Sequence, residues 1–274
     1  MKTTSISSKT VIFITGAYVS HRGWASWKTY FDRRGFNTIL PSWPEKDGVP
    51  KDLREDKNSK VPSVRLNDVI EHYASIIKRL PEKPIAIGHS LGGLISQILL
   101  ERGLVEAAAV IHSVPPQGII PFEFSFLKSA WRSLGLFTDT RKPYIMSFET
   151  WQYAFANGMS LKEQRSSYNE NVIPESKLAL RDGLTHVAKV DFNKARGPLL
   201  MIAGAKDNII PATLNRRNFN AYRKNKSITA FKLYADRNHL TLNQAGWEKV
   251  ADDIIAWLEG VGRINTQIAE REVA

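Results

Sequence analysis

Short apolar segments alternate along the chain with longer amphipathic ones. The segment at residues 11–15 is apolar without alternation, which is typical of a strand buried on both faces. Further short apolar segments, also predicted to be strands, occupy residues 37–40, 84–88, 107–112, 198–203 and 228–234. Helical spacing of apolar positions predicts helices at residues 22–34, 63–80, 91–102, 212–223 and 244–258. Strands that alternate with helices in this way predict βαβ units and a parallel sheet.

Two stretches depart from this alternation. Ten of the sixteen residues at 45–60 are charged, which predicts an exposed loop. Ten of the 34 residues at 122–155 are aromatic, against 10% of the whole chain. We therefore expect residues 114–189 to form a helical cap, or lid, over one end of an α/β core. That core would consist of residues 1–113 and 190–274, with a frayed tail after Gly260.

The composition excludes several classes of protein. The chain has 274 residues, of which 43% are hydrophobic and 24% are charged, so it is neither disordered nor fibrous. It has no cysteine, which excludes disulfides, cysteine-ligated metals and a thiol nucleophile. The polar start of the chain and the lack of any run of ~20 apolar residues lead us to expect a cytoplasmic protein without a membrane span.

The net charge of +11 raises the question of an acidic partner. The densest basic cluster comprises Arg216, Arg217, Arg223, Lys224 and Lys226. Such a cluster is typical of a solvated helix face and the loop after it, so we expect no nucleic-acid partner. Attraction to anionic lipid surfaces or acidic substrates stays open, because net charge alone does not separate these cases.

The clearest chemical motif is Gly88-His-Ser-Leu-Gly-Gly93, which lies where a predicted strand meets a predicted helix. A Gly-x-Ser-x-Gly sequence in that position predicts a nucleophile elbow, a strained turn from which the Ser90 hydroxyl projects at the edge of the sheet. The glycines avoid collisions with the neighbouring strand and helix. The backbone N–H of Leu91, at the start of the helix, would then face a developing oxyanion.

A nucleophile elbow requires an acid and a histidine later in the chain, in that order. Asp207 follows the strand predicted at residues 198–203, and His239 follows the strand predicted at 228–234. Because the carboxyl ends of parallel strands share one edge of the sheet, we expect Ser90, Asp207 and His239 to converge there. An isolated turn aspartate and a loop histidine are the simpler interpretations, but neither explains the order.

These motifs resemble those of the α/β-hydrolases with a serine nucleophile, a family that includes esterases, lipases and lysophospholipases. The resemblance spans residues 11–260 and implies the α/β-hydrolase fold, here with a mostly parallel sheet of about six strands. It also implies that the second oxyanion donor is the N–H of Ala17. Thr15 and Asn238 depart from the family pattern, which usually has histidine and glycine at these positions.

The predicted activity is hydrolysis of a carboxylic ester or related acyl bond. In this interpretation Ser90 attacks the carbonyl carbon, His239 transfers the proton and Asp207 orients the imidazole. A serine at position 90 disfavours the family members with an aspartate nucleophile. Lactonase, thioesterase, carbon–carbon hydrolase and cofactor-free haloperoxidase activities stay open, as does a ligand-binding receptor with little turnover.

The aromatic residues of the expected cap suggest an apolar small-molecule substrate. Their spacing predicts two apolar faces, one against the sheet and one toward a cavity over Ser90. We expect Tyr18, Trp131 and Trp151 to contact the substrate. No His, Asp and Glu grouping has the spacing of a metal site, so neither a metal nor a cofactor is expected. His89 and His112 are expected to serve packing and strand-end roles.

Overall fold

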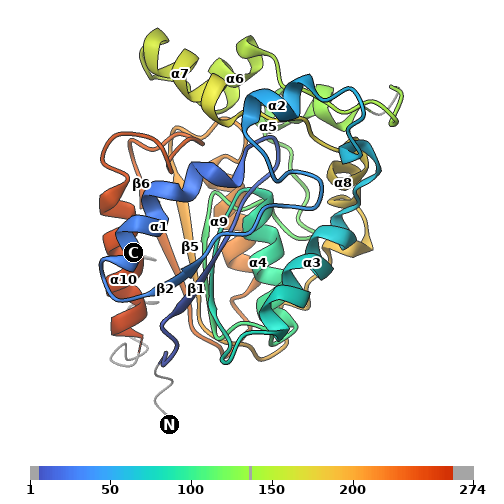
Figure 1. The fold of residues 1–274 in the computed structure, drawn as a ribbon. Helices are drawn as coiled ribbons and strands as arrows, with labels where there is room; N and C mark the ends of the chain where they lie inside the picture. The colour runs from blue at the N-terminus through green and yellow to red at the C-terminus, as the bar shows by residue number, and fades with distance from the viewer. Residues whose placement is uncertain (1–5, 136–137, 262–274) are drawn as a thin grey trace.

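The computed structural model describes residues 6–135 and 138–261, in which six strands form one parallel sheet (Figure 1). The strands are β1 (Thr10–Ile14), β2 (Asn37–Ile39), β3 (Ile85–His89), β4 (Ala107–Ile111), β5 (Leu199–Gly204) and β6 (Thr229–Tyr234). Their order across the sheet is β2-β1-β3-β4-β5-β6, with parallel pairing throughout. This arrangement confirms the predicted α/β fold.

Helices cover both faces of the sheet and form two apolar cores. The helices concerned are α1 (Ala25–Asp32), α3 (Leu66–Lys78), α4 (Leu91–Glu101), α9 (Ala212–Ala221) and α10 (Glu248–Gly260), with a 3-10 turn at His21–Trp24 before α1. Side chains of α1 and α10 pack in one core, and those of α3, α4 and α9 in the other. Successive residues of β1 alternate between the cores, since Phe13 faces the first and Ile14 the second.

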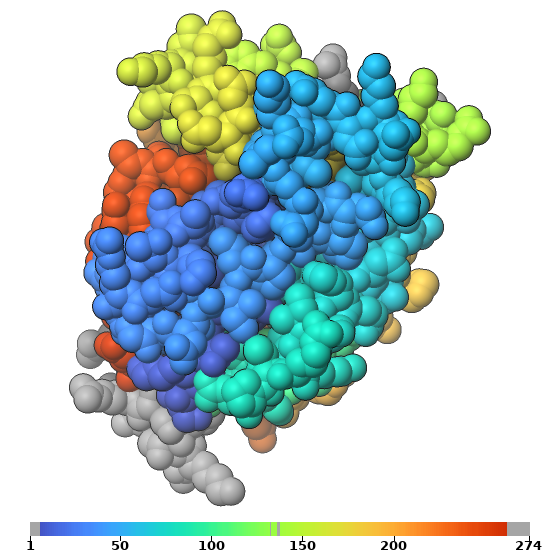
Figure 2. Space-filling model, in the orientation of Figure 1, coloured from blue at the N-terminus to red at the C-terminus, as the bar shows by residue number. Residues whose placement is uncertain are grey.

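The chain between β4 and β5 is helical, as the break in the strand–helix alternation predicts. Its helices are α5 (Phe124–Leu134), α6 (Phe148–Ala154), α7 (Leu161–Asn171) and α8 (Lys177–Asp182), followed by a 3-10 turn at His186–Ala188. Figure 1 shows α6 and α7 beyond the ends of the strands, and Figure 2 shows this segment in yellow and green at one end of the molecule. Its role as a separate cap stays a prediction.

The charged stretch at residues 45–60 is not simply an exposed loop. It contains the helix α2 (Pro50–Glu55), which packs against α7. Lys46 is buried, because its ammonium group pairs with Glu175. The prediction of an exposed loop was therefore wrong for Lys46, because this side chain has a charged partner far along the chain.

Two helix boundaries also differ from the prediction. The predicted helix at 63–80 begins only at Leu66, after a 3-10 turn at Val61–Ser63, because the Asp68 carboxylate accepts a hydrogen bond from the Arg65 N–H at 2.9 Å. The closing helix begins at Glu248 rather than at residue 244. The tail expected to be frayed lies outside the described residues beyond Val261.

The basic cluster near α9 is only partly solvated. Arg223, Lys224 and Lys226 are exposed, whereas Arg217 pairs with Glu123 at 2.7 Å. Residues 6–135 and 138–261 contain no helix with the length and apolar character needed to cross a bilayer. The cytoplasmic location stays a prediction.

Candidate active site

Ser90 lies in a tight turn between β3 and α4 and has the backbone conformation expected of a nucleophile elbow. Its φ of 57° and ψ of −122° are unfavourable for a residue with a side chain. The Ser90 N–H donates a hydrogen bond to the Ile111 carbonyl at 3.0 Å, which ties the turn to the neighbouring strand β4. A Cβ on Gly92 would lie 2.1 Å from the Ile14 carbonyl oxygen, so only glycine fits at this position.

Asp207 follows β5 and is held by backbone groups of its own turn. Its Oδ1 atom accepts hydrogen bonds from the N–H groups of Ile209 at 2.9 Å and Ile210 at 2.8 Å. Its Oδ2 atom lies 2.7 Å from Nδ1 of His239, and both side chains are 0% exposed. The two predicted partners therefore come together although 32 residues separate them.

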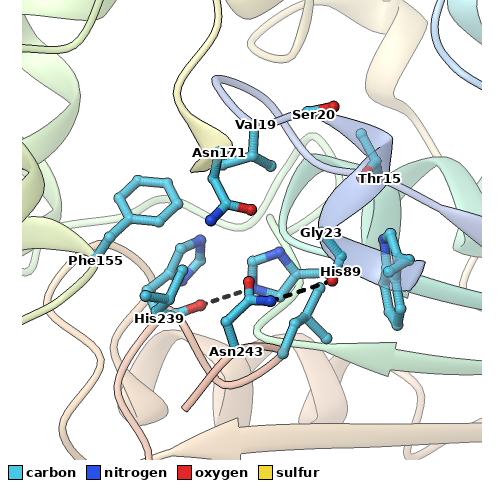
Figure 3. A pocket seen from close by; sticks show the side chains of 12 residues that line it. Thr15, Val19, Ser20, Gly23, His89, Phe155, Asn171, His239 and Asn243 are labelled. Atoms are coloured by element: carbon cyan, nitrogen blue, oxygen red, sulfur yellow. Dashed lines mark hydrogen bonds between the residues drawn. The ribbon is translucent and has the colours of Figure 1, made fainter. Parts of the chain in front are cut away.

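The imidazole of His239 has one ring nitrogen engaged and the other free. Since the Asp207 carboxylate can only accept, Nδ1 is the protonated nitrogen. Nε2 is buried and has no hydrogen-bond partner among the described residues. His89 Nε2 lies 2.9 Å from the His239 carbonyl oxygen. The rings of His239 and Phe155 are nearly perpendicular, with centroids 4.6 Å apart (Figure 3). These contacts fix the ring with an unprotonated nitrogen available to accept a proton.

Burial and charge set the protonation states of this pair in opposite ways. Burial lowers the pKa of His239, and the neighbouring Asp207 carboxylate offsets this only in part. Burial alone would raise the pKa of Asp207, but the charges of His239 and His112 and the hydrogen bond from His239 more than compensate and leave it well below its usual range. At neutral pH the site therefore holds a carboxylate beside a neutral imidazole.

The loop after β1 lies directly against Ser90. A Cβ on Gly16 would be 2.7 Å from the Ser90 Cβ and 3.4 Å from its Oγ. The next two residues, Ala17 and Tyr18, differ in what their N–H groups bond to. The Tyr18 N–H donates to Glu175 Oε2 at 2.7 Å. In the described part of the chain, neither Ala17 N–H nor Leu91 N–H donates a hydrogen bond to a protein acceptor. Both N–H groups are therefore free among the described residues.

A buried ion pair, which the sequence analysis did not predict, supports this loop. The Lys46 ammonium and the Glu175 carboxylate are paired, with side chains 3% and 0% exposed. Glu175 thus links the segment after β2, the loop after β1 and the helical segment before β5. No local signal marks the pair, since its members lie 129 residues apart.

His112 is a second residue at the site that the sequence analysis assigned only to a strand-end role. Its Nδ1 lies 2.7 Å from Asp207 Oδ2, and its Nε2 lies 2.7 Å from Thr241 Oγ1. Its position directly after β4, between the strands that carry Ser90 and Asp207, follows from the strand order. A histidine directly after the strand between those two could therefore have indicated a residue at the site.

His112, Asp207 and His239 also form the one grouping of potential metal ligands within the described residues. Both ring nitrogens lie 2.7 Å from Asp207 Oδ2, which is the length of a charge-assisted N–H···O hydrogen bond. Asp207 is hydrogen-bonded to His239 and lies in close contact with His112.

The three residues expected to contact substrate occupy different environments. Tyr18 is buried and donates its hydroxyl to Ser133 Oγ of α5 at 2.7 Å. Trp151 is 0% exposed and stacks on Phe155, with ring centroids 4.5 Å apart. Trp131, on α5, is 62% exposed. Trp151 thus supports a ring that contacts His239, whereas Trp131 faces solvent.

A small pocket of about 10 Å³ reaches His239 and is shown in Figure 3. Its walls include Thr15, His89 and Phe155. A space of this size is close to that of one water molecule. The predicted apolar cavity over Ser90 stays a prediction.

Comparison with known proteins places the chain among hydrolases. The model of the alpha/beta hydrolase family matches residues 11–253. No curated protein matches the chain by sequence.

Three solved structures with the same fold illustrate its structural relatives. An extracellular alpha/beta-hydrolase from a Paenibacillus species is 17% identical, with a TM-score of 0.67 over 90% of this chain and 97% of that one. A pyrethroid hydrolase from Sphingobium faniae is 17% identical, with a TM-score of 0.66 over 94% and 100% of the two chains. A monoacylglycerol lipase from Paleococcus ferrophilus is 19% identical, with a TM-score of 0.63 over 92% and 94%.

Proposed function

The chain belongs to the alpha/beta hydrolase family, and from that premise we propose that it hydrolyses carboxylic esters through an acyl-enzyme formed on Ser90. The observation that carries the proposal is the state of His239. Its Nδ1 is hydrogen-bonded to Asp207, and its Nε2 is buried without a partner among the described residues. A general base needs this combination of one oriented nitrogen and one free nitrogen.

The proposed reaction has two halves. Ser90 Oγ attacks the ester carbonyl carbon while His239 Nε2 takes the hydroxyl proton, and the resulting imidazolium is stabilised by Asp207. Collapse of the tetrahedral intermediate breaks the bond to the alcohol, which leaves with the proton from Nε2. Water then attacks the acyl-enzyme with the same proton transfers and releases the carboxylic acid and free Ser90.

The oxyanion of each tetrahedral intermediate would be bound by the N–H groups of Ala17 and Leu91. Two observations support this assignment: the loop after β1 lies against Ser90, and both N–H groups are free within the described residues. Tyr18 N–H is excluded because Glu175 accepts from it. Loss of a single donor of this kind costs about 3–4 kcal/mol of transition-state stabilisation.

The proposed substrate is a small ester with an apolar acyl or alcohol part. Phe155 packs its ring against His239, and both Trp151 and Tyr18 pack against Phe155. Two of the structural relatives are named for a pyrethroid and for a monoacylglycerol. Apolar rings beside the proposed base favour a substrate that buries carbon rather than charge.

The test is hydrolysis of p-nitrophenyl esters by the wild type and by two serine variants. We expect Ser90→Ala to reduce kcat by several orders of magnitude with an unchanged fold, because no other group replaces the nucleophile. Ser96→Ala is the matched control, since Ser96 is also a buried serine near the turn, and its hydroxyl donates to the Gly92 carbonyl at 2.8 Å. Equal rates for Ser90→Ala and the wild type would disprove the proposal.

A ligand-binding receptor on the same fold makes a different prediction. It would bind esters saturably without measurable release of p-nitrophenol, and Ser90→Ala would leave binding unchanged. Such a result would replace the proposed hydrolytic function.

A further inference from the structure

Asp207 faces two histidines, although the proposed reaction needs only one. His239 Nδ1 and His112 Nδ1 each lie 2.7 Å from the same oxygen, Oδ2, and all three side chains are 0% exposed. The other oxygen is already saturated by the N–H groups of Ile209 and Ile210. His239 and His112 therefore compete for one acceptor atom.

The position of the proton on His112 follows from its neighbours. An ionised carboxylate can only accept hydrogen bonds, so a ring nitrogen 2.7 Å from Oδ2 must carry a hydrogen. Thr241 Oγ1, 2.7 Å from the opposite nitrogen, also lies 2.8 Å from the Asn238 carbonyl oxygen. The hydroxyl has one hydrogen, which it donates to the Asn238 carbonyl, so toward His112 it acts as the acceptor for an N–H at Nε2. Nδ1 of His112 thus lies in close contact with Asp207 Oδ2, although it makes no aligned hydrogen bond there.

The two N–H contacts are unequal in direction. The bond from His239 to Asp207 has normal hydrogen-bond geometry. The contact from His112 is equally short, but its ring hydrogen is too far off the line to Oδ2 to make a well-aligned bond. His239 is therefore the principal partner of the carboxylate, and His112 acts on it mainly through charge and dipole.

The backbone of His112 supports a specific role for this side chain. Its φ of 49° lies in the left-handed region, which is unfavourable for histidine. The N–H of His112 donates to the Ile202 carbonyl at 2.8 Å, and a Cβ on Gly204 would lie 2.6 Å from the ring. A strained backbone and an absent side chain opposite together hold the imidazole against Asp207.

We propose that His112 is a positioning residue that draws negative charge from Asp207 and so weakens His239 as a base. The proposal rests on the proposed function, because it concerns the proton affinity of the same His239. A carboxylate that lies against a second imidazole as well as His239 stabilises the His239 imidazolium less than one that faces His239 alone. His239 then stays neutral, and able to accept the Ser90 proton, at lower pH.

The charged and titratable groups around His112 are consistent with this role. Asp207 faces it from the turn after β5. His239 faces it from the loop after β6, and the ring centroids of His112 and His239 are 5.6 Å apart. His89 faces it from β3 at 5.9 Å. Among these groups Asp207 raises the pKa of His239, while His112 lowers it.

Two substitutions distinguish the effect of the His112 N–H group from the effect of the size of its side chain. His112→Leu removes the hydrogen that faces Asp207. His112→Asn retains an N–H donor near the position of Nδ1 and tolerates a left-handed backbone. Ser113→Ala is the matched control, because Ser113 is the next buried residue and bonds with Gln97 and Val114, outside the Asp207 cluster.

The readout is the pH dependence of kcat/KM for a p-nitrophenyl ester. We expect the acid limb to move up by about one pH unit in His112→Leu, and to stay near the wild-type position in His112→Asn and Ser113→Ala. If His112→Leu fails to fold, His112→Gln tests the same point, since its amide replaces Nε2 rather than Nδ1. An acid limb at the same pH in all variants would overturn the proposal.

A second readout separates this proposal from the proposed function. The His239 resonances can be titrated by NMR in Ser90→Ala, with and without His112→Leu, and no turnover is needed. An upward shift of the His239 pKa in the double variant supports the role of His112 even if no ester is hydrolysed. No shift overturns it, while full activity of Ser90→Ala would count against the proposed function instead.

Discussion

The Asp207 side chain is 0% exposed. It accepts hydrogen bonds from the N–H groups of Ile209 and Ile210 and from His239, and it lies 2.7 Å from His112 Nδ1. An ionised carboxylate survives burial only with such compensation. The compensation also decides what the residue can do. His239 and His112 keep it ionised, the backbone donors hold the carboxylate in place, and the bond to His239 orients the imidazole.

At the residue scale, we predict how activity varies with pH. Because burial lowers the pKa of His239 below 6.5, kcat/KM should be constant near neutrality and fall about tenfold per pH unit only below that value. A pH series with a p-nitrophenyl ester measures the acid limb directly. An acid limb above pH 7 would mean that another group acts as the base.

The orientation of His239 gives a second prediction at this scale. Asp207→Asn should reduce kcat by about 10³- to 10⁴-fold, because an amide can donate to Nδ1 and stabilise the wrong tautomer. Thermal unfolding would show whether the variant still folds. A folded variant with a near wild-type rate would show that the acid is misassigned.

At the element scale, Glu175 connects three segments that lie far apart in the sequence. It pairs with Lys46 after β2, accepts from Tyr18 N–H after β1, and lies just before α8. Loss of one partner from a buried ion pair leaves an uncompensated charge and costs about 3–5 kcal/mol.

We therefore predict that Lys46→Met lowers the free energy of unfolding and also reduces kcat, because the loop that carries Ala17 loses its support. The double variant Lys46→Met, Glu175→Gln removes both charges and should regain much of the stability. Urea unfolding and ester kinetics on the three proteins test this. A single variant as stable as the wild type would show that the pair does not hold the loop.

Glu123 ties the start of α5 to α9. Its carboxylate accepts from Arg217 and from Thr213, and although burial opposes ionisation, these bonds lower its pKa to about 2. Because the folded-state pKa lies below the usual value, the stabilisation is complete above pH 4.5 and is lost as the pH falls toward 2.

Glu123→Gln should therefore destabilise the protein at pH 7 and make little difference near pH 2. Urea unfolding of both proteins across this pH range measures the difference. A difference that does not change with pH would show that the charge of Glu123 is not what links the two helices.

At the scale of the whole molecule, the strand–helix alternation was sufficient to predict the parallel sheet and the convergence of Asp207 with His239. Both follow from local patterns and from the shared edge of parallel strands. His112 required the order of the strands, since only that order puts β4 between the nucleophile and the acid. The pairing of Lys46 with Glu175 could not be predicted, because it joins residues 129 positions apart and no periodic pattern in the sequence indicates it.

The relation between the helical segment and the core gives a prediction about substrates. Trp151 stacks on Phe155, which contacts His239, while Trp131 is 62% exposed. For p-nitrophenyl esters of increasing acyl length, kcat/KM should rise by about fourfold per methylene, or ~0.8 kcal/mol, until the site is full. Trp131→Ala and Trp151→Ala should each flatten this dependence if both side chains contact the substrate. A profile that is flat in the wild type and in both variants would show that these rings serve only packing.

The central claim is that Ser90 becomes covalently acylated, and mass spectrometry of the protein after treatment with a fluorophosphonate tests it most directly. We predict one adduct per chain on the peptide that contains Ser90, lost in Ser90→Ala and retained in Ser96→Ala. Labelling should also slow sharply in Asp207→Asn, because the reaction depends on His239. An unmodified Ser90 in active protein, or an adduct that persists in Ser90→Ala, would contradict the claim.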